Sequence, residues 1–399
     1  MNNSQIVDLT HRNLVDIYGC LPIALVRGNG SYLEDADGNR YLDFFCGLAV
    51  TNLGHSHPRV VRAIRKQSER LMHVSNIFHT EPTARLAEQL AKRFGDGRVF
   101  FGNSGAEANE AAIKLARRWG HKDGGGRFEI IATLGSFHGR TLATLSATGQ
   151  EKYHQGFQPL VPGFKMAPFD DVEAFGRAIG ENTVAVMIEP IQGEGGVVVP
   201  KLDYLKRVRE FCDRNKLLMI LDEIQVGIGR TGKFFAYEHA GIKPDIITLA
   251  KALGGGLPLG AMIAKSEIAS SLTPGSHGTT FGGNPVSCAA GLATVEAIEE
   301  EKVLENATRM GAHIIGRLRE VAKTCDRIRE VRGLGMIIGV VLKHDPKPVV
   351  DACLKEKLLV NGTAGNVLRM LPPLNLSRED ADQGLAIIER ALRTAPMPA

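Results

Sequence analysis

Short apolar runs alternate with amphipathic stretches through the middle of the chain. Runs such as Val184–Ile188 and Leu217–Leu221 are apolar at every position, which is typical of strands buried on both faces. The strand candidates are Arg98–Phe101, Glu129–Thr133, Val184–Glu189, Leu217–Asp222, Ile246–Leu249 and Ala261–Ala264. Helical patterns lie between them, over Ala106–Trp119, Val172–Ile179 and Leu202–Asn215. This alternation predicts a mostly parallel α/β sheet, whose ligands bind at the carboxyl ends of the strands.

The two ends of the chain follow other patterns. Asp37-Gly38 lies between two partly alternating runs in residues 31–45 and predicts a hairpin. Helical patterns follow at Pro58–Leu71 and from Glu81. After Pro285, one long helical pattern is followed by strands around glycines and a closing helix, over Ala289–Ala322, Val331–Leu342 and Asp380–Leu392. We expect a smaller C-terminal α+β domain there.

The composition of the chain argues against several classes of function. The chain has 399 residues, 44% of them hydrophobic, and a net charge of only +4, so nothing favours binding to nucleic acid. No apolar run approaches the roughly 20 residues that span a bilayer, and the first residues lack the pattern of a signal peptide. The six cysteines are scattered and mostly in apolar surroundings, which indicates reduced thiols in a cytoplasmic protein.

Lys251 stands between the apolar run Ile246–Leu249 and the glycine-rich turn Gly254–Gly256. Surface lysines usually lie among polar residues. A lysine at the carboxyl edge of a sheet, with flexible backbone beside it, is well placed to form an imine with a carbonyl compound. A lone lysine in such a turn is nevertheless more often structural, so its partners decide the interpretation.

A possible anion site begins at Asn103-Ser-Gly105, which follows a strand and opens a helix. Ser104 can cap that helix, and Gly105 lets backbone N–H groups approach a phosphate. An ordinary capped helix is the commoner explanation of such a motif taken alone. The chain lacks the glycine spacing of dinucleotide sites and the lysine of the P-loop.

Two acidic residues, Glu189 and Asp222, end other strand candidates. Asp222 could act as a base, cap a helix, hold a positively charged ring nitrogen or ligate a metal. A metal site needs further ligands at set spacing, and we expect none here. If a helix begins after Asp222, Gln225 lies one turn away and faces the same ligand.

These three pieces together fit pyridoxal 5′-phosphate. This cofactor needs a phosphate cradle, an acid beside its pyridinium nitrogen and a lysine that forms an imine. Asp222 would keep the ring nitrogen protonated, and Lys251 would then move the proton as general acid and base. The order of the three motifs favours catalysis over separate structural roles.

With these motifs, the chain resembles the class III (ω-) aminotransferases, pyridoxal-phosphate enzymes of fold type I. The matching segments are Asn103–Asn109, Phe137–Thr141, Glu189–Gly196, Leu221–Gly232, Lys251–Pro258 and Gly278–Pro285. The resemblance spans nearly the whole chain. It implies a large, mostly parallel, seven-stranded sheet domain and a smaller α+β domain built from both chain ends. The expected boundaries are 1–56 and 287–399 for the small domain and 57–286 for the large one.

The resemblance also assigns roles to the cofactor's neighbours. Lys251 would carry the imine, Asp222 would contact the pyridinium nitrogen and Gln225 the phenolic oxygen. Phe137 would lie on the ring face, and Ser104, Gly105 and Ala106 would hold the phosphate. Thr280 would reach the phosphate of a neighbouring subunit, which implies a homodimer with shared active sites.

The expected substrate contacts centre on two arginines, because a guanidinium recognises a carboxylate through two parallel hydrogen bonds. By resemblance, Arg140 grips the carboxylate of the amine donor far from the reacting amine, and Arg369 binds the α-carboxylate of 2-oxoglutarate. Glu194 matches an acid that neutralises Arg369 while the amine donor is bound. Tyr18 and Thr279 complete the expected set, although Ile17-Tyr18 and Met370 depart from the common Asn-Tyr and Phe of the family.

Within the family, Ser136-Phe-His-Gly-Arg140, the Glu-Gly-Gly of residues 194–196 and the compact length are closest to the branch that acts on N2-acetylornithine. The expected reaction is a ping-pong transfer of the 5-amino group to 2-oxoglutarate in arginine biosynthesis, with N-succinyl-diaminopimelate as a further donor. Another ω-aminotransferase, for ornithine or 4-aminobutyrate, is the alternative. A relative that no longer transaminates is a more remote one, against which the intact pair Lys251 and Asp222 argues.

Overall fold

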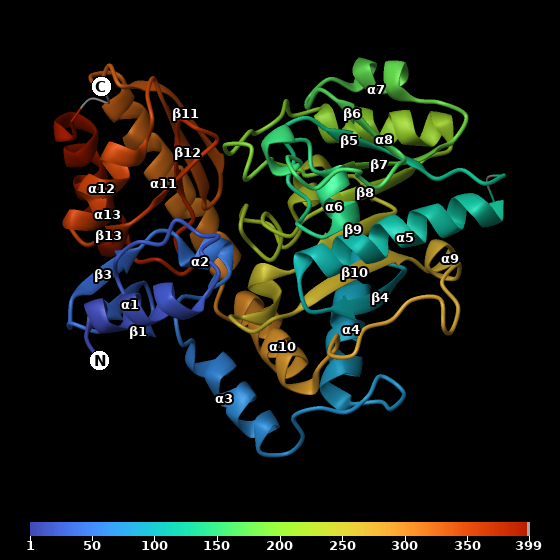
Figure 1. Ribbon diagram of the computed structural model, residues 1–399, viewed down its shortest axis with the longest axis horizontal. Helices are drawn as coiled ribbons and strands as arrows, with labels where there is room; N and C mark the ends of the chain where they lie inside the picture. The colour runs from blue at the N-terminus through green and yellow to red at the C-terminus, as the bar shows by residue number, and fades with distance from the viewer. Residues whose placement is uncertain (124, 397–399) are drawn as a thin grey trace.

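A seven-stranded sheet forms the centre of the computed structural model, which describes residues 1–123 and 125–396. Its strands are β4 (Gly97–Gly102), β5 (Glu129–Thr133), β6 (Phe164–Ala167), β7 (Thr183–Ile188), β8 (Leu218–Asp222), β9 (Ile246–Leu249) and β10 (Gly260–Lys265), in the order β4-β10-β9-β8-β7-β5-β6. Only β10 runs against its neighbours β4 and β9. The predicted mostly parallel sheet of seven strands is confirmed (Figure 1).

Helices cover both faces of this sheet, and its central strands β7, β8 and β9 are buried at every position. In β8, Leu218 and Ile220 pack in the same cluster as the inner side of α5 (Gly105–Asp123). The alternate residues Met219 and Leu221 pack in the cluster that contains α8 (Tyr204–Asn215). Successive side chains of a strand point to opposite faces, so an unbroken apolar run supplies two interfaces at once.

Two further sheets form the other lobe and bring the chain ends together (Figure 1). The first has the order β1-β2-β3-β13, and the second β11-β12-β15-β14. Their strands are β1 (Leu25–Asn29), β2 (Tyr32–Asp35), β3 (Arg40–Asp43), β11 (Ile328–Leu334), β12 (Ile337–Leu342), β13 (Leu358–Leu359), β14 (Asn361–Thr363) and β15 (Val367–Met370). β2 and β3 form the expected hairpin, and β13 pairs with β3 in parallel. The domain boundaries at residues 56 and 286 stay predictions.

The other helices complete both lobes. The longer ones are α1 (Asn3–Asn13), α3 (Pro58–Ser68), α4 (Glu81–Phe94), α10 (Pro285–Glu300), α11 (Val303–Ala322), α12 (Lys347–Lys355) and α13 (Arg378–Thr394). The shorter ones are α2 (Cys46–Ala49), α6 (Leu142–Ala147), α7 (Val172–Ala178), α9 (Ser266–Ala269), η1 (Glu151–Tyr153), η2 (Ala236–Ala240) and η3 (Lys251–Gly254). None of the described helices has the length and apolar character needed to cross a membrane.

The structure corrects two expectations from the sequence and adds one strand that was not expected. The long helical pattern after Pro285 is two helices, because Lys302 has the left-handed φ of 52° and ends the regular hydrogen bonding between α10 and α11. No helix begins after Asp222, where the chain forms a series of turns. Strand β6 was not expected, since it is a short edge strand that is buried only at Ala167.

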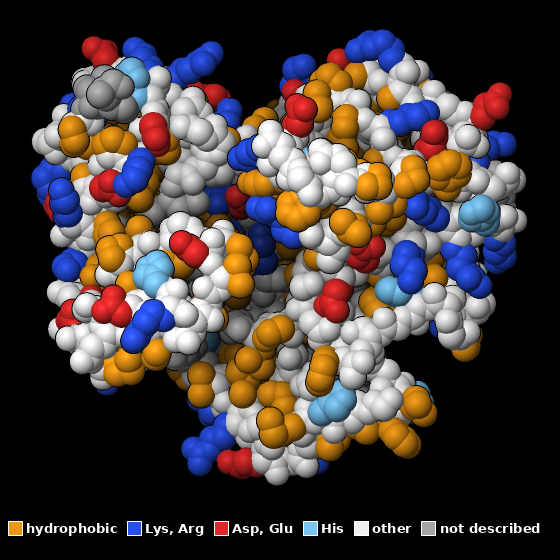
Figure 2. Space-filling view, in the orientation of Figure 1, with side chains coloured by type: hydrophobic (Ala, Val, Ile, Leu, Met, Phe, Trp, Pro, Cys, Tyr) orange, Lys and Arg blue, Asp and Glu red, His pale blue; other side chains and the backbone are white. Residues whose placement is uncertain are grey.

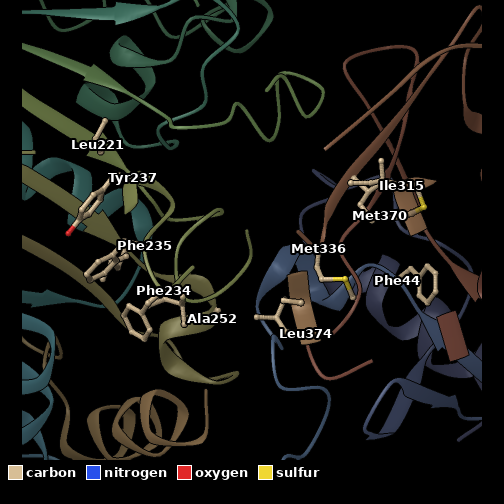
Figure 3. Packing of buried hydrophobic residues seen from close by; sticks show 14 of the residues in the cluster. Phe44, Leu221, Phe234, Phe235, Tyr237, Ala252, Ile315, Met336, Met370 and Leu374 are labelled. Carbon is tan, nitrogen blue, oxygen red and sulfur yellow. The ribbon is translucent and has the colours of Figure 1, made fainter. Parts of the chain in front are cut away.

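The two lobes are tied by the buried guanidinium of Arg230. It lies in the turns after β8 and donates from Nη1 to the carbonyl oxygens of Met336 (3.0 Å) and Pro372 (2.5 Å), and from Nη2 to Oδ1 of Asn52. Figure 3 shows the packing on both sides, with Phe234, Phe235 and Tyr237 against the large sheet and Phe44, Met336, Met370 and Leu374 in the other lobe. Arg230 therefore joins segments from the start, middle and end of the chain.

A second buried polar anchor, Glu223, follows the last residue of β8. Its carboxyl group accepts hydrogen bonds from the backbone N–H groups of Ala236 (2.6 Å) and Tyr237 (2.8 Å). Burial nevertheless dominates and raises the pKa of Glu223 to about 8. The folded protein thus favours the protonated form of this side chain.

Replacing Arg230 with methionine should lower the free energy of unfolding by about 2–4 kcal/mol, since each buried acceptor left without a partner costs about 1–3 kcal/mol. Urea denaturation followed by circular dichroism measures the change. Arg65→Met, at an exposed position of α3, is the matched control and should change stability by less than about 0.5 kcal/mol. Equal losses of unfolding free energy in the two variants would contradict the role of Arg230 in joining the two lobes.

Glu223→Gln should become more stable relative to the wild type as pH rises from 4.5 to 8. In that window an unfolded glutamate releases its proton while the folded Glu223 keeps it, so the wild type loses stability with rising pH. One pKa unit corresponds to about 1.4 kcal/mol, and we expect a relative gain of at least about 1 kcal/mol. Urea titrations at both ends of the window test this. The exposed Glu88→Gln should show no comparable trend.

Candidate active site

A cavity of about 490 Å³ opens at the carboxyl ends of the parallel strands, between the two lobes. Figure 2 shows the hollow, with acidic and basic side chains in its depth. The lining residues that the sequence singled out are Ser104, Gly105, Ala106, Phe137, Arg140, Glu189, Glu194, Asp222, Gln225 and Lys251. Segments more than 140 residues apart in the chain thus meet where the strand pattern predicted.

Lys251 lies two residues after the end of β9 and starts η3 with a left-handed φ of 47°. Its amine lies inside the cavity, and no described residue forms a hydrogen bond or ion pair with it. Burial lowers the pKa of Lys251 below its ordinary value, although the carboxylates of Glu194 and Asp222 oppose that change. A larger share of the amine is therefore neutral and nucleophilic than in water.

Asp222 ends β8 and is held by three donors. Its Oδ2 accepts from Nδ2 of Asn109 and from Nδ1 of His138, each at 2.8 Å, and its Oδ1 accepts from the N–H of Ile224 at 3.0 Å. Asn109 is itself fixed, because its Nδ2 also donates to the carbonyl of His138 and its Oδ1 accepts from Thr248. The carboxylate thus has one orientation, toward the cavity.

His138 was not expected from the sequence, although it lies inside the segment Phe-His-Gly-Arg. Its ring is buried, which opposes the charged form, but the hydrogen bond and the charge of Asp222 outweigh burial and raise the pKa of His138. A positive imidazole beside Asp222 stabilises the ionised carboxylate. The sequence could have shown only that a polar residue stood next to Phe137. The hydrogen bond between His138 and Asp222 depends on how the loop around His138 folds.

The N-terminus of α5 opens into the cavity with unpaired N–H groups. Ser104 caps the helix as predicted, since its Oγ accepts from the N–H of Glu107 at 3.2 Å. The first N–H groups of a helix have no acceptor within it, and they favour an anion. At Gly105 a Cβ would lie 2.8 Å from Cδ1 of Ile224, so only glycine allows this close approach of the helix start to the Asp222 turn.

Glu189 connects two walls of the cavity. Its carboxyl group accepts from the N–H of Phe137 at 3.0 Å and from the N–H of Gly193 at 3.3 Å. Burial raises the pKa of Glu189 to about 8, even though the charge of His138 opposes the rise. This side chain holds the Phe137 segment against the loop that carries Glu194.

Arg369 is fully buried on β15 and is paired with Glu194, as the family resemblance implied. Its Nη1 lies 2.6 Å from Oε1 of Glu194 and also donates to the Gly193 carbonyl at 3.2 Å. Gln225 contacts both partners, with its Nε2 on Glu194 and its Oε1 accepting from Arg369. Burial alone would raise the pKa of Glu194, but Arg369 outweighs it and lowers the pKa.

Arg140 is in the opposite situation. Its side chain is exposed at the cavity wall, and among the described residues it forms no hydrogen bond or ion pair. Its Cζ lies 4.0 Å from the ring centroid of Tyr153 and 5.6 Å from that of Phe137. All the N–H donors of this guanidinium are open to a ligand.

Besides Arg369, which contacts Glu194, three expected residues are not among those that line this cavity within the single chain. Tyr18 is 73% exposed, and Thr280 is exposed as well. Thr279 lines a different cavity, and its Oγ1 accepts from Nδ2 of Asn103 at 3.2 Å. The roles of these three residues stay predictions.

The donor set fits pyridoxal 5′-phosphate. An unpaired amine, a fixed carboxylate and an unpaired helix N-terminus line one cavity of about 490 Å³, and Phe137 contributes an aromatic ring to its wall. Lys251 would hold the aldehyde carbon, Asp222 the ring nitrogen, and residues 104–106 the phosphate. The three functional groups come from different elements, as a planar cofactor with three distinct contacts requires.

Comparison with known proteins agrees with this site. The family model described as aminotransferase class III matches residues 17–392. An acetylornithine aminotransferase of Methanocaldococcus jannaschii is 50% identical, with 96% of each chain covered. A solved ornithine aminotransferase of Toxoplasma gondii, described with partial occupancy of PLP at its active site, is 34% identical with a TM-score of 0.96 and covers 99% of this chain and 95% of that one.

A solved acetylornithine aminotransferase of Elizabethkingia anophelis has a TM-score of 0.89 at 32% identity and covers 98% of this chain and 99% of that one. The match thus extends over both lobes and over the whole lining of the cavity. The chain belongs to the class III aminotransferases and is a pyridoxal-phosphate-dependent enzyme.

Proposed function

We propose that the enzyme transfers the 5-amino group of N2-acetylornithine to 2-oxoglutarate, and that it serves arginine biosynthesis. The observation that carries this proposal is the contrast between Arg140, which lines the cavity, and Arg369, which contacts Glu194 of its lining. Arg140 is unpaired and open, whereas Arg369 is buried and paired with Glu194. The name shared by the curated relatives supports the same donor.

This contrast suits an amine donor with one carboxylate far from the reacting amine. Arg140 would bind that carboxylate through two parallel hydrogen bonds. Glu194 would meanwhile neutralise Arg369, so the buried guanidinium does not compete for the same group. For 2-oxoglutarate, which has two carboxylates, Glu194 would leave Arg369 and free it for the second one. The pair therefore lets one cavity accept two substrates in turn.

The catalytic roles follow from the same groups. When bound, pyridoxal 5′-phosphate supplies an electron sink for the carbon that loses its proton. Lys251 would hold the cofactor and afterwards move the proton, and its lowered pKa favours the neutral amine that both tasks need. Asp222, ionised and oriented by His138 and Asn109, would keep the ring nitrogen protonated.

We further propose a homodimer that shares its active sites. Thr280 is exposed and lies outside the cavity of its own chain, as expected of a residue that reaches a partner's cofactor. The segment around Tyr18 is also apolar and exposed, with Val15 at 81% and Ile17 at 70%. A cytoplasmic location fits six free cysteines, five of them buried.

A panel of amine donors with 2-oxoglutarate as acceptor tests the proposed substrate. We expect N2-acetylornithine to have the highest kcat/KM, with N-succinyl-diaminopimelate as a second donor, because both combine an acylated amino-acid end with a distant amine. The panel should include ornithine and 4-aminobutyrate. A higher kcat/KM for either of these two would overturn the assignment.

Arg140→Gln should raise the KM for N2-acetylornithine by at least about tenfold, since a charge-assisted bidentate contact contributes about 1.5–3 kcal/mol. N-acetylputrescine is the same donor without the carboxylate, and its KM should hardly change. Steady-state kinetics with both donors measure the two effects. If both KM values rose together, Arg140 would not be the carboxylate-binding residue.

A further inference from the structure

The guanidinium of Arg140 lies against aromatic rings. Among the described residues it has no hydrogen-bond acceptor or carboxylate partner, in contrast to Arg369, which has four recorded hydrogen bonds. A long, exposed arginine without polar contacts samples many rotamers, and fixing them costs roughly 2 kcal/mol of side-chain entropy. Its nearest recorded ring contact is Tyr153, at 4.0 Å from Cζ to the ring centroid.

Tyr153 is itself well supported. It ends the short turn η1, and the next residue anchors that turn. Nε2 of His154 lies 3.0 Å from the Leu145 carbonyl and 2.8 Å from the Thr148 carbonyl, both near the end of α6. The Tyr153 and Phe137 rings also form a T-shaped pair with a centroid distance of 5.8 Å and an interplanar angle of 81°. The half-buried ring thus offers a fixed surface beside the cavity.

Stacking and carboxylate binding use different parts of a guanidinium. An aromatic ring contacts its flat face, whereas the N–H groups point outward in its plane. A ring under Arg140 therefore restricts the side chain and leaves its donors free for a carboxylate. A carboxylate in the place of Tyr153 would restrict it too, but would occupy those donors, as Glu194 does at Arg369.

We propose that Tyr153 is a positioning residue that holds Arg140 ready for the substrate carboxylate and so raises the preference for carboxylate-bearing donors. This inference rests on the proposed function, in which Arg140 binds that carboxylate. Tyr153 acts through Arg140 and does not itself line the cavity. The part of the molecule that sets donor preference thereby extends to η1 and to the histidine that anchors it.

The test compares Tyr153→Leu with Tyr153→Phe on the enzyme with its cofactor bound. Tyr153→Leu should raise the KM for N2-acetylornithine by about two- to fivefold, the range expected for a lost cation–π contact, with little change in kcat. The KM for N-acetylputrescine should stay at the wild-type value. Tyr153→Phe keeps the ring and should restore the wild-type ratio of the two KM values.

A binding measurement separates this effect from turnover. N-acetylnorvaline has the acylated carboxylate end of the donor but no reacting amine, and its dissociation constant can be measured by calorimetry. Tyr153→Leu should weaken its binding by the same about two- to fivefold, and the double variant with Arg140→Gln should lose no more than Arg140→Gln alone.

Different results would contradict the carboxylate contact of Arg140 and the positioning role of Tyr153. If wild-type enzyme shows no preference for N2-acetylornithine over N-acetylputrescine, the proposed carboxylate contact is wrong. If that preference exists but Tyr153→Leu leaves it unchanged, or raises both KM values equally, the role of Tyr153 is wrong. An unchanged near-visible absorbance of the bound cofactor checks that the variants remain folded around it.

Discussion

The buried negative charge of Asp222 is the constraint on which the site depends. A carboxylate removed from water costs several kcal/mol unless charges and hydrogen bonds replace its hydration. Here His138, Asn109 and the N–H of Ile224 supply that replacement, and Thr248 and the His138 carbonyl in turn fix Asn109. The end of β8, the start of α5 and the loop after β5 must all be in place before this charge is stable.

The remaining charges of the cavity are balanced with one another. Arg369 lowers the pKa of Glu194, and Glu194 and Asp222 limit how far burial lowers the pKa of Lys251. The higher pKa of Glu189 keeps a further negative charge away from Asp222. These shifts favour the ionised form of Glu194 and the neutral form of Lys251, and a change at one group alters the others through the same low-dielectric space.

Most of the fold and much of the site could be predicted from local patterns in the sequence. An apolar run such as Val184–Ile188 predicts a strand in a sheet that helices cover on both faces, and the strand ends fix where Asp222 and Lys251 lie. The features that the sequence patterns did not predict have physical causes. β6 is half-exposed, so its pattern is weak, and the left-handed Lys302 breaks a helix without a glycine or proline to mark it.

The polar contacts around Asp222 could not be read in the same way. Asn109 lies on α5, His138 in the loop after β5 and Thr248 on β9, so no spacing along the chain encodes the network. The stacking of Arg140 on Tyr153 likewise depends on how η1 folds back. Sequence patterns locate side chains on elements, whereas contacts between loops follow only from the assembled structure.

The parallel pairing of β3 with β13 has a consequence for how the protein is made. Leu42 pairs with Leu358 and Asp43 with Leu359, so the sheet β1-β2-β3-β13 cannot close until nearly the whole chain has left the ribosome. At roughly 5–20 residues per second, that delay is on the order of 15 s to 1 min. During this time the hairpin of β2 and β3 has an open edge that can pair with other chains. The newly made N-terminal segment therefore exposes this edge until β13 has been synthesised.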